Sequence, residues 1–221
     1  MSRSVVLNPQ PRCARCRLPP RWCICAGLHE VALPLQVDVL MHHREQWRPS
    51  STGHLIARAV AGSRQHLWEC ERGLRAEDVR RAGRELWILH PHGRPMAREA
   101  TPENVQVLFI DGAWKEATLM AREVSGWGRL VSLPMTGESR YLLRTQQGGG
   151  RFSTFEALLF VVEAFGLMAA HAALRLQFEL HVYAGLRSRG SKAAAEAFLA
   201  SSPLREGLPD LIAQLNVRRP R

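Results

Sequence analysis

The segment Val105-Gln106-Val107-Leu108-Phe109-Ile110 is almost wholly apolar, and it ends at Asp111-Gly112-Ala113-Trp114, before a helix-like segment over 115–123. Such a run is typical of a strand that is buried on both faces of a parallel α/β sheet, where ligands bind at the carboxyl ends of the strands. Asp111 therefore lies where catalytic groups are commonly placed. An Asp at a strand-to-helix junction is also a favoured helix N-cap, so this second role stays open.

Strands and helices alternate along the rest of the chain. The apolar pattern predicts four more strands, at 35–41, 65–70, 85–90 and 129–133. Helices are predicted from the hydroxyl residues 50–52 to Gly62, around 76–82, at 157–165 after the capping-box spacing of Ser153 to Glu156, and from about 167 to 187. Residues 134–150 are expected to form a long loop. We therefore expect an α/β fold.

The length of the chain suits one sizeable domain with a small appendage. It has 221 residues, of which 46% are hydrophobic, so disorder is not expected. We assign residues 1–30 to a basic N-terminal segment and residues 31–221 to the α/β domain. No stretch approaches the ~18 consecutive apolar residues that a membrane span needs, and the first residues lack the apolar core of a signal peptide. We expect a cytoplasmic protein.

The charge of the chain favours a polyanionic partner. There are 30 Lys and Arg residues against 20 Asp and Glu, and the sequence pI is about 10.6. This balance is typical of proteins that bind nucleic acid. Residues 1–29 contain no acidic residue and five arginines, namely Arg3, Arg12, Arg15, Arg17 and Arg21. We expect this basic patch to contact RNA, with Arg15, Arg17 and Arg21 as the contacts.

Four of the five cysteines fall within thirteen residues, as Cys13-x-x-Cys16 and Cys23-x-Cys25. Thiolates at such short spacings can converge on one tetrahedral ion, and in a reducing compartment this favours zinc over disulfides. Four ligands leave no open position, so we expect a structural zinc knuckle. An iron–sulfur cluster and a redox pair at Cys13 and Cys16 remain as alternatives. The fifth cysteine, Cys70, is predicted to be an inert buried residue.

Three further segments follow the cysteine motif in a recognisable order. They are Glu45-x-x-Arg48-Pro49-Ser50-Ser51-Thr52-Gly53, Asp111-Gly112-Ala113-Trp114, and Ser139-Arg140-Tyr141-Leu142-Leu143-Arg144 leading into Ser153-Thr154-Phe155-Glu156-Ala157. Together the four segments, over about residues 13–165, resemble the DTW-domain family, the tRNA-uridine aminocarboxypropyltransferases. Two positions depart from the family pattern: Ala113 replaces the threonine of Asp-x-Thr-Trp, and Ser51 replaces an asparagine. The loss of the hydroxyl at position 113 removes one hydrogen bond to the cofactor or to the backbone.

The resemblance implies a reaction, a partner and a fold. The reaction is transfer of the 3-amino-3-carboxypropyl group of S-adenosylmethionine to N3 of a uridine in tRNA, with release of methylthioadenosine. The fold is SPOUT-like, with a mostly parallel sheet, flanking helices and the cofactor in a C-terminal trefoil knot, one of the few exceptions to unknotted topology.

Site residues follow from the motifs and from the resemblance. Asp111 is expected to accept the uridine N3 proton or to orient the base edge, and Trp114 to stack on uracil or adenine unless it is part of the core. The expected cofactor site comprises Ser51, Thr52, Leu133, Tyr141, Arg144, Ser153 and Thr154, with the hydroxyl residues at predicted helix N-termini. Arg48 and Arg140, like Arg144, suit tRNA phosphate or the cofactor carboxylate. Glu156 is expected to act only as a cap.

Other functions fit parts of the same pattern. One alternative is an rRNA-directed aminocarboxypropyltransferase or a SPOUT-type RNA methyltransferase, which uses the same donor. A different class is a non-catalytic zinc-knuckle protein that binds RNA through its basic arm.

Overall fold

The structure is a computed structural model, and it describes residues 11–69, 73–96, 100–144 and 150–217. Its centre is one five-stranded sheet with the strand order β2-β1-β4-β3-β5. The strands are β1 (Gln36–His42), β2 (Arg64–Trp68), β3 (Glu85–Pro95), β4 (Val105–Asp111) and β5 (Arg129–Ser132). All four neighbouring pairs are parallel, so the predicted α/β fold with a parallel sheet is confirmed.

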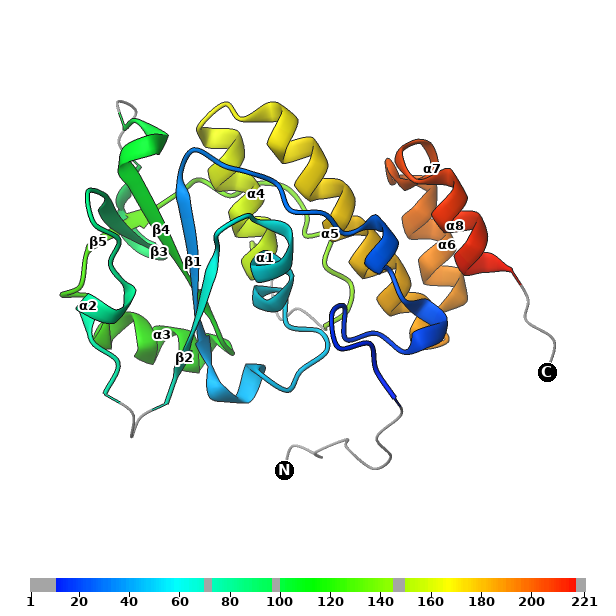
Figure 1. Ribbon diagram of the computed structural model, residues 1–221, viewed down its shortest axis with the longest axis horizontal. Helices are drawn as coiled ribbons and strands as arrows, with labels where there is room; N and C mark the ends of the chain where they lie inside the picture. The colour runs from blue at the N-terminus through cyan, green and yellow to red at the C-terminus, as the bar shows by residue number, and fades with distance from the viewer. Residues whose placement is uncertain (1–10, 70–72, 97–99, 145–149, 218–221) are drawn as a thin grey trace.

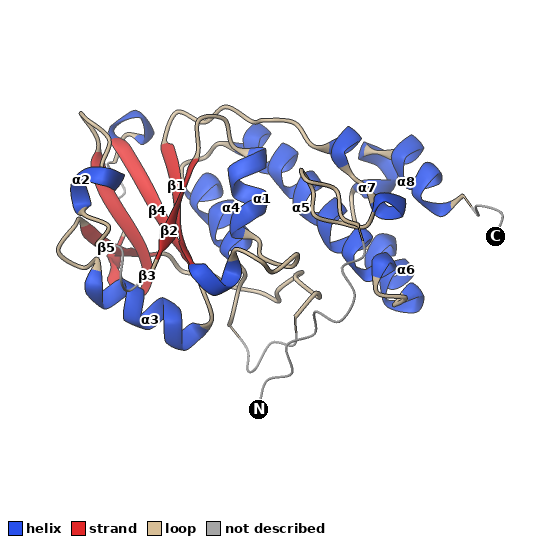
Figure 2. Ribbon diagram, turned by 60° about the horizontal axis from the view of Figure 1, so that its bottom comes forward, coloured by secondary structure: helices blue, strands red, loops and turns tan. Residues whose placement is uncertain are grey.

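Helices cover both faces of the sheet (Figures 1 and 2). One face carries α1 (Gly53–Ala59), α4 (Thr154–Ala164) and α5 (Met168–Ser188), and the other carries α2 (Ala76–Val79) and α3 (Trp114–Glu123). Along the decisive strand β4, Val107 and Phe109 belong to the large core under α1, α4 and α5, whereas Leu108 belongs to the smaller core under α2 and α3. Successive side chains of a strand point to opposite faces, so two buried faces produce the unbroken apolar run of this segment.

The remaining elements lie at the ends of this layered body. Three helices pack beside the end of α5, namely α6 (Lys192–Ala200), α7 (Leu204–Gly207) and α8 (Pro209–Asn216). The described residues also contain four short 3₁₀ helices, η1 (Pro20–Trp22), η2 (Cys25–Gly27), η3 (His43–Glu45) and η4 (Pro102–Asn104). The cysteine-rich segment folds onto the same body, because Cys16, Leu18 and Ile24 are buried in the large core. Among the described residues, no helix combines the length and the apolar character needed to cross a membrane.

Several element bounds differ from the predicted ones. The first helix ends at Ala59 rather than at Gly62, because Val60 turns to extended backbone and forms a parallel bridge with Val31. Strand β3 continues to Pro95 through an irregularity after Leu89. The helix predicted over 76–82 is a single turn. Cys70, Arg3 and residues 145–149 lie outside the described residues.

Candidate functional site

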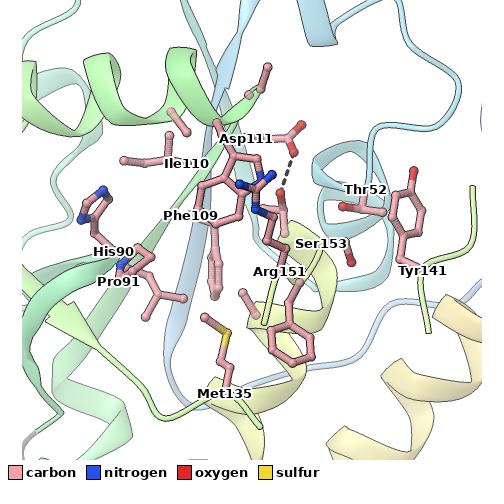
Figure 3. A pocket seen from close by; sticks show the side chains of 18 of the residues that line it. Thr52, His90, Pro91, Phe109, Ile110, Asp111, Met135, Tyr141, Arg151 and Ser153 are labelled. Atoms are coloured by element: carbon pink, nitrogen blue, oxygen red, sulfur yellow. Dashed lines mark hydrogen bonds between the residues drawn. The ribbon is translucent and has the colours of Figure 1, made fainter. Parts of the chain in front are cut away.

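The candidate site lies where the strand order reverses. Strands β1 and β4 are neighbours, and the chain leaves them toward opposite edges of the sheet. From β1 it continues to β2 at one edge, and from β4 it continues to β5 at the other edge. In an open parallel sheet this point leaves a crevice at the carboxyl ends of the strands. A cavity of about 400 Å³ opens here (Figure 3), in the range of small-molecule pockets. Its walls come from the ends of β3 and β4, from the start of α3 and α4, and from the loops 48–52 and 133–144.

Asp111 ends β4 and lies in this pocket with only 4% of its surface exposed. Its two carboxylate oxygens accept hydrogen bonds from the hydroxyls of Ser51 and Thr154, both at 2.6 Å. The alternative reading of Asp111 as a helix cap is wrong, because Ala113 occupies the N-cap position of α3. The carboxylate is therefore held in the pocket by two hydroxyls that come from the starts of two other helices.

Gly53 gives the carboxylate of Asp111 its room. A Cβ atom on this glycine would lie 2.6 Å from Oδ2 and 2.8 Å from Cγ of Asp111. Both distances are shorter than non-bonded contacts allow, so any larger residue at position 53 would displace the carboxylate of Asp111. The predicted capping role of the hydroxyls 50–52 is wrong for α1, whose N-cap residue Thr52 makes no side-chain cap bond. Thr52 Oγ1 accepts a hydrogen bond from the amide of Phe155 instead, at 3.4 Å.

Ser153 and Glu156 form the predicted capping box at the start of α4. Ser153 Oγ accepts from the Glu156 amide at 3.3 Å, and the Glu156 carboxylate accepts from the Ser153 amide at 2.7 Å. Glu156 also accepts from the amide of Arg140 at 2.7 Å and from the hydroxyl of Ser139 at 2.9 Å. The cap thus also fastens the loop that leads to Tyr141.

Glu45 organises the cationic side of the pocket, and no role was predicted for it. Its carboxylate is buried and accepts from Arg48 and from Arg144, each at 2.5 Å. Two guanidinium groups against one carboxylate leave a net positive charge at the pocket wall. The neighbouring Tyr141 and Glu45 raise the pKa of Arg144 although burial opposes this. Glu45 begins the motif Glu45-x-x-Arg48, and this spacing was the signal for an ion pair.

Tyr141 is a buried hydrogen-bond donor in the same wall. Its hydroxyl donates to the Ser50 carbonyl. Burial raises the pKa of Tyr141 to about 12. The phenol therefore stays protonated at neutral pH and holds the 48–52 loop in place.

Trp114 lies at the mouth of the pocket and is not a core residue. It is the first residue of α3 and half of its surface is exposed. The Arg151 guanidinium lies 5.0 Å from the centre of its ring, a cation–π distance. Arg151 and His90 both line the pocket and were not predicted. Burial and the neighbouring His92 lower the pKa of His90, so its imidazole is neutral at pH 7.

The predicted cofactor residues are largely brought together. Six of them line the pocket, namely Thr52, Leu133, Tyr141, Arg144, Ser153 and Thr154, together with Asp111, Trp114 and Arg48. Ser51 lies behind Asp111 and is buried. Arg140 is not at this pocket: its guanidinium pairs with Glu179 at 2.9 Å and lines a smaller neighbouring cavity.

The predicted RNA-binding arginines of the N-terminal segment differ in their surroundings. Arg15 is exposed, with one bond to the Leu28 carbonyl at 3.2 Å. Arg21 turns onto the protein, where it donates to the carbonyls of Leu215 and Val217 at 2.8 and 2.6 Å. Arg17 donates to the Gln46 carbonyl. Their contacts with RNA stay a prediction.

Cys13, Cys16, Cys23 and Cys25 converge, with their four sulfur atoms all within 4.8 Å of one another. The sulfur atoms of Cys13 and Cys25 are 3.4 Å apart, and those of Cys16 and Cys23 are 3.8 Å apart. Four sulfurs at ~2.3 Å from a tetrahedral zinc ion are about 3.8 Å apart, so these residues fit such a metal. The Cys16 amide lowers the pKa of the Cys13 thiol to about 6, whereas burial raises the pKa of the Cys16 and Cys25 thiols. A bound cation would offset this burial and favour all four thiolates.

Comparison with known families agrees with this arrangement. No match to the chain was found among solved structures. The family model described as the DTW domain matches residues 10–184 of the 221, a range that contains the cysteine cluster and every wall of the pocket. The chain therefore belongs to the DTW-domain family, the family of tRNA-uridine aminocarboxypropyltransferases.

Proposed function

We propose that the protein transfers the 3-amino-3-carboxypropyl group of S-adenosylmethionine to N3 of a uridine in tRNA. The observation that carries the proposal is the buried Asp111 carboxylate in a pocket of about 400 Å³ that also contains an arginine wall. The family supports the class of reaction and the RNA partner, because it acts on tRNA.

The charges of the pocket suit this donor. S-adenosylmethionine carries a sulfonium, an ammonium and a carboxylate. We assign the carboxylate to Arg144, which is half-buried beside Glu45 and Arg48, and the cationic part to the side of Asp111. The adenine then meets the apolar side chains of Phe109, Leu133 and Met135, of which Leu133 is one of the expected cofactor residues.

The reaction needs one proton transfer and one substitution at carbon. The uracil N3 attacks the methylene next to the sulfur, the carbon–sulfur bond breaks, and its electron pair stays on sulfur in neutral methylthioadenosine. The N3 proton passes to Asp111, whose carboxylate has about four acceptor positions. The Ser51 and Thr154 hydroxyls occupy two of these, so both oxygens retain acceptor capacity. The uridine must be unpaired to expose N3, and Trp114 offers it a stacking face.

His90 is the competing base, because its neutral imidazole lines the same pocket. The two candidates are separated by Asp111→Asn and His90→Gln, which keep shape and remove the basic group. We expect Asp111→Asn to lower the transfer rate by about 10²-fold or more, the usual contribution of a general base. His90→Gln should keep most of the activity, and the reverse result would transfer the role to His90.

The assay is incubation of the protein with S-adenosylmethionine and unmodified tRNA, followed by mass spectrometry of the nucleosides. Aminocarboxypropyl uridine and methylthioadenosine are the expected products. Adenosylhomocysteine would indicate a methyltransferase instead, and modification of rRNA alone would favour the rRNA-directed enzyme. Unchanged uridine in every tRNA, with no donor bound, would favour the non-catalytic RNA-binding protein.

We propose zinc as the ion of the four-cysteine cluster. A closed set of four thiolates supplies no open position, so the ion would be structural and take no part in transfer. Iron found on protein with all four thiols intact would indicate the iron–sulfur alternative.

A further inference from the structure

The loop between β1 and α1 carries Trp47, the most exposed large hydrophobic side chain of the described residues. Its surface is 79% exposed. The next residue, Arg48, lines the pocket, so Trp47 is one residue along the chain from the wall of the candidate site. Both neighbouring arginines, Arg44 and Arg48, have exposed side chains, whereas the acidic residue of the loop, Glu45, is buried and paired. Arg44 pairs with Glu116 at 3.3 Å and Arg48 pairs with Glu45 at 2.5 Å, and each guanidinium still has donors on its exposed side. The outer surface of the loop is therefore an indole ring between two arginines.

The backbone of this loop is held from several sides. The Arg48 amide donates to the Glu45 carbonyl at 3.0 Å, and the Ser51 amide donates to the Arg48 carbonyl at 2.9 Å. Tyr141 donates to the carbonyl of Ser50. An exposed indole on a well-held loop gains nothing from burial within this chain, so packing does not explain it.

Arg17 ties this loop to the cysteine knuckle. Its Nη1 donates to the Gln46 carbonyl, one residue before Trp47, and to His54 Nε2 at 2.9 Å. With Nε2 as the acceptor, the proton of His54 lies on Nδ1, which donates to Gln65 at 2.9 Å. In Figure 1 the dark blue knuckle lies beside the light blue segment that joins β1 to α1.

The backbone of Arg17 is strained. Its φ of 58° is the single positive value among the described non-glycine residues. Glycine adopts this backbone conformation without strain, whereas a residue with a Cβ atom adopts it only at a cost in free energy. The hydrogen bonds of the guanidinium to the Gln46 carbonyl and to His54 offset that strain. We therefore explain the arginine at this position by its side-chain contacts with the loop.

We infer that Trp47 stacks on an unpaired nucleotide of the RNA substrate, next to the one that enters the pocket, and that Arg17 positions its loop. An aromatic ring among arginines is the combination that binds single-stranded nucleic acid, because the ring accepts any base and the cations accept phosphate. The inference rests on the proposed function, since it names how the same site holds its RNA.

The test is direct binding of a fluorescently labelled, unmodified tRNA, measured by anisotropy without turnover. Stacking on one base contributes about 1–3 kcal/mol, so Trp47→Ala should weaken tRNA binding by about tenfold. Trp47→Phe, which keeps an aromatic face, should bind within about threefold of the parent protein, on the same stacking scale. The slope of log Kd against log salt should not change, because no phosphate contact is lost. The matched control is Met168→Ala on α5, a side chain that is also largely exposed.

Arg17→Gly tests the positioning role, and its backbone suits glycine. We expect unchanged zinc content and melting temperature but weaker tRNA binding. The double variant Arg17→Gly with Trp47→Ala should bind no more weakly than Trp47→Ala alone, because both changes act through one contact. Additive losses would show that Arg17 binds RNA by itself.

Unchanged tRNA affinity of Trp47→Ala would overturn the inference, and so would a parent protein that binds no tRNA. A parent protein that binds tRNA through Trp47 but transfers nothing to uridine would overturn the proposed function and leave the inference standing.

Discussion

Ala113→Thr restores the hydroxyl that the family pattern has at this position, and the structure specifies what it would do. Ala113 is the N-cap residue of α3, with φ −63° and ψ 154°. Its amide already donates to the Glu116 carboxylate at 2.9 Å, which is one half of a capping box. A threonine hydroxyl would accept from the Glu116 amide and complete the other half.

The expected gain follows from one added cap. Replacing alanine by a good N-cap residue stabilises a protein by about 1 kcal/mol. The backbone angles are those of extended chain, which a β-branched residue adopts readily, and the position is exposed, so no packing cost opposes the gain. In a chain of this size 1 kcal/mol raises the melting temperature by about 2–4 °C.

The measurement is urea and thermal unfolding of the parent, Ala113→Thr and Ala113→Val. Valine has the shape of threonine without the hydroxyl and should give no gain. Because the hydroxyl is directed to the backbone, the KM for S-adenosylmethionine should stay unchanged. Equal stabilisation by valine, or a lower KM without stabilisation, would refute the assignment of this hydroxyl to the helix cap.

Three further predictions concern the site, a buried histidine and the metal cluster. Gly53→Ala should lower the transfer rate at least tenfold, because it displaces Asp111, and circular dichroism should show that the helix content is retained. The control is Gly126→Ala, where a Cβ meets nothing within 4 Å, and it should have the parent activity. Full activity of Gly53→Ala would show that the position of the carboxylate is not critical. Burial lowers the pKa of His181 to about 3. Below the ordinary pKa of 6.5 the unfolded chain binds a proton that the folded chain does not, so the free energy of unfolding should fall from about pH 6.5 to 3, by up to about 1.4 kcal/mol per pH unit. His181→Met should reduce this slope in urea unfolding, and an identical slope would assign the titration to another group. Cys16→Ser should remove the metal found by elemental analysis and lower the melting temperature, because Cys16 is buried in the large core; a variant with full metal content would exclude it as a ligand.

Local pattern predicted the elements and the chemistry carried by contiguous motifs. The apolar run before Asp111 indicated a strand buried on both faces, and the spacing of Ser153 and Glu156 indicated a capping box, which the structure contains. The short spacings of the cysteines indicated one cluster. These inferences hold because the neighbours that matter are close in the chain, where backbone periodicity sets which side chains meet.

Contacts between distant segments required the tertiary structure. Ser51 and Thr154 are hydrogen-bond partners of Asp111, from which they lie 60 and 43 residues away along the chain, and no local pattern predicted these two bonds. The sequence left two roles open for Asp111, a helix cap or a residue of the pocket. The structure excludes the cap, because Ala113 is the N-cap residue of α3. Arg17 likewise acquired its contact with the Trp47 loop, because Gln46 is 29 residues further along the chain. Composition and spacing determine which groups are present, whereas the order of strands in the sheet determines which of them share one crevice.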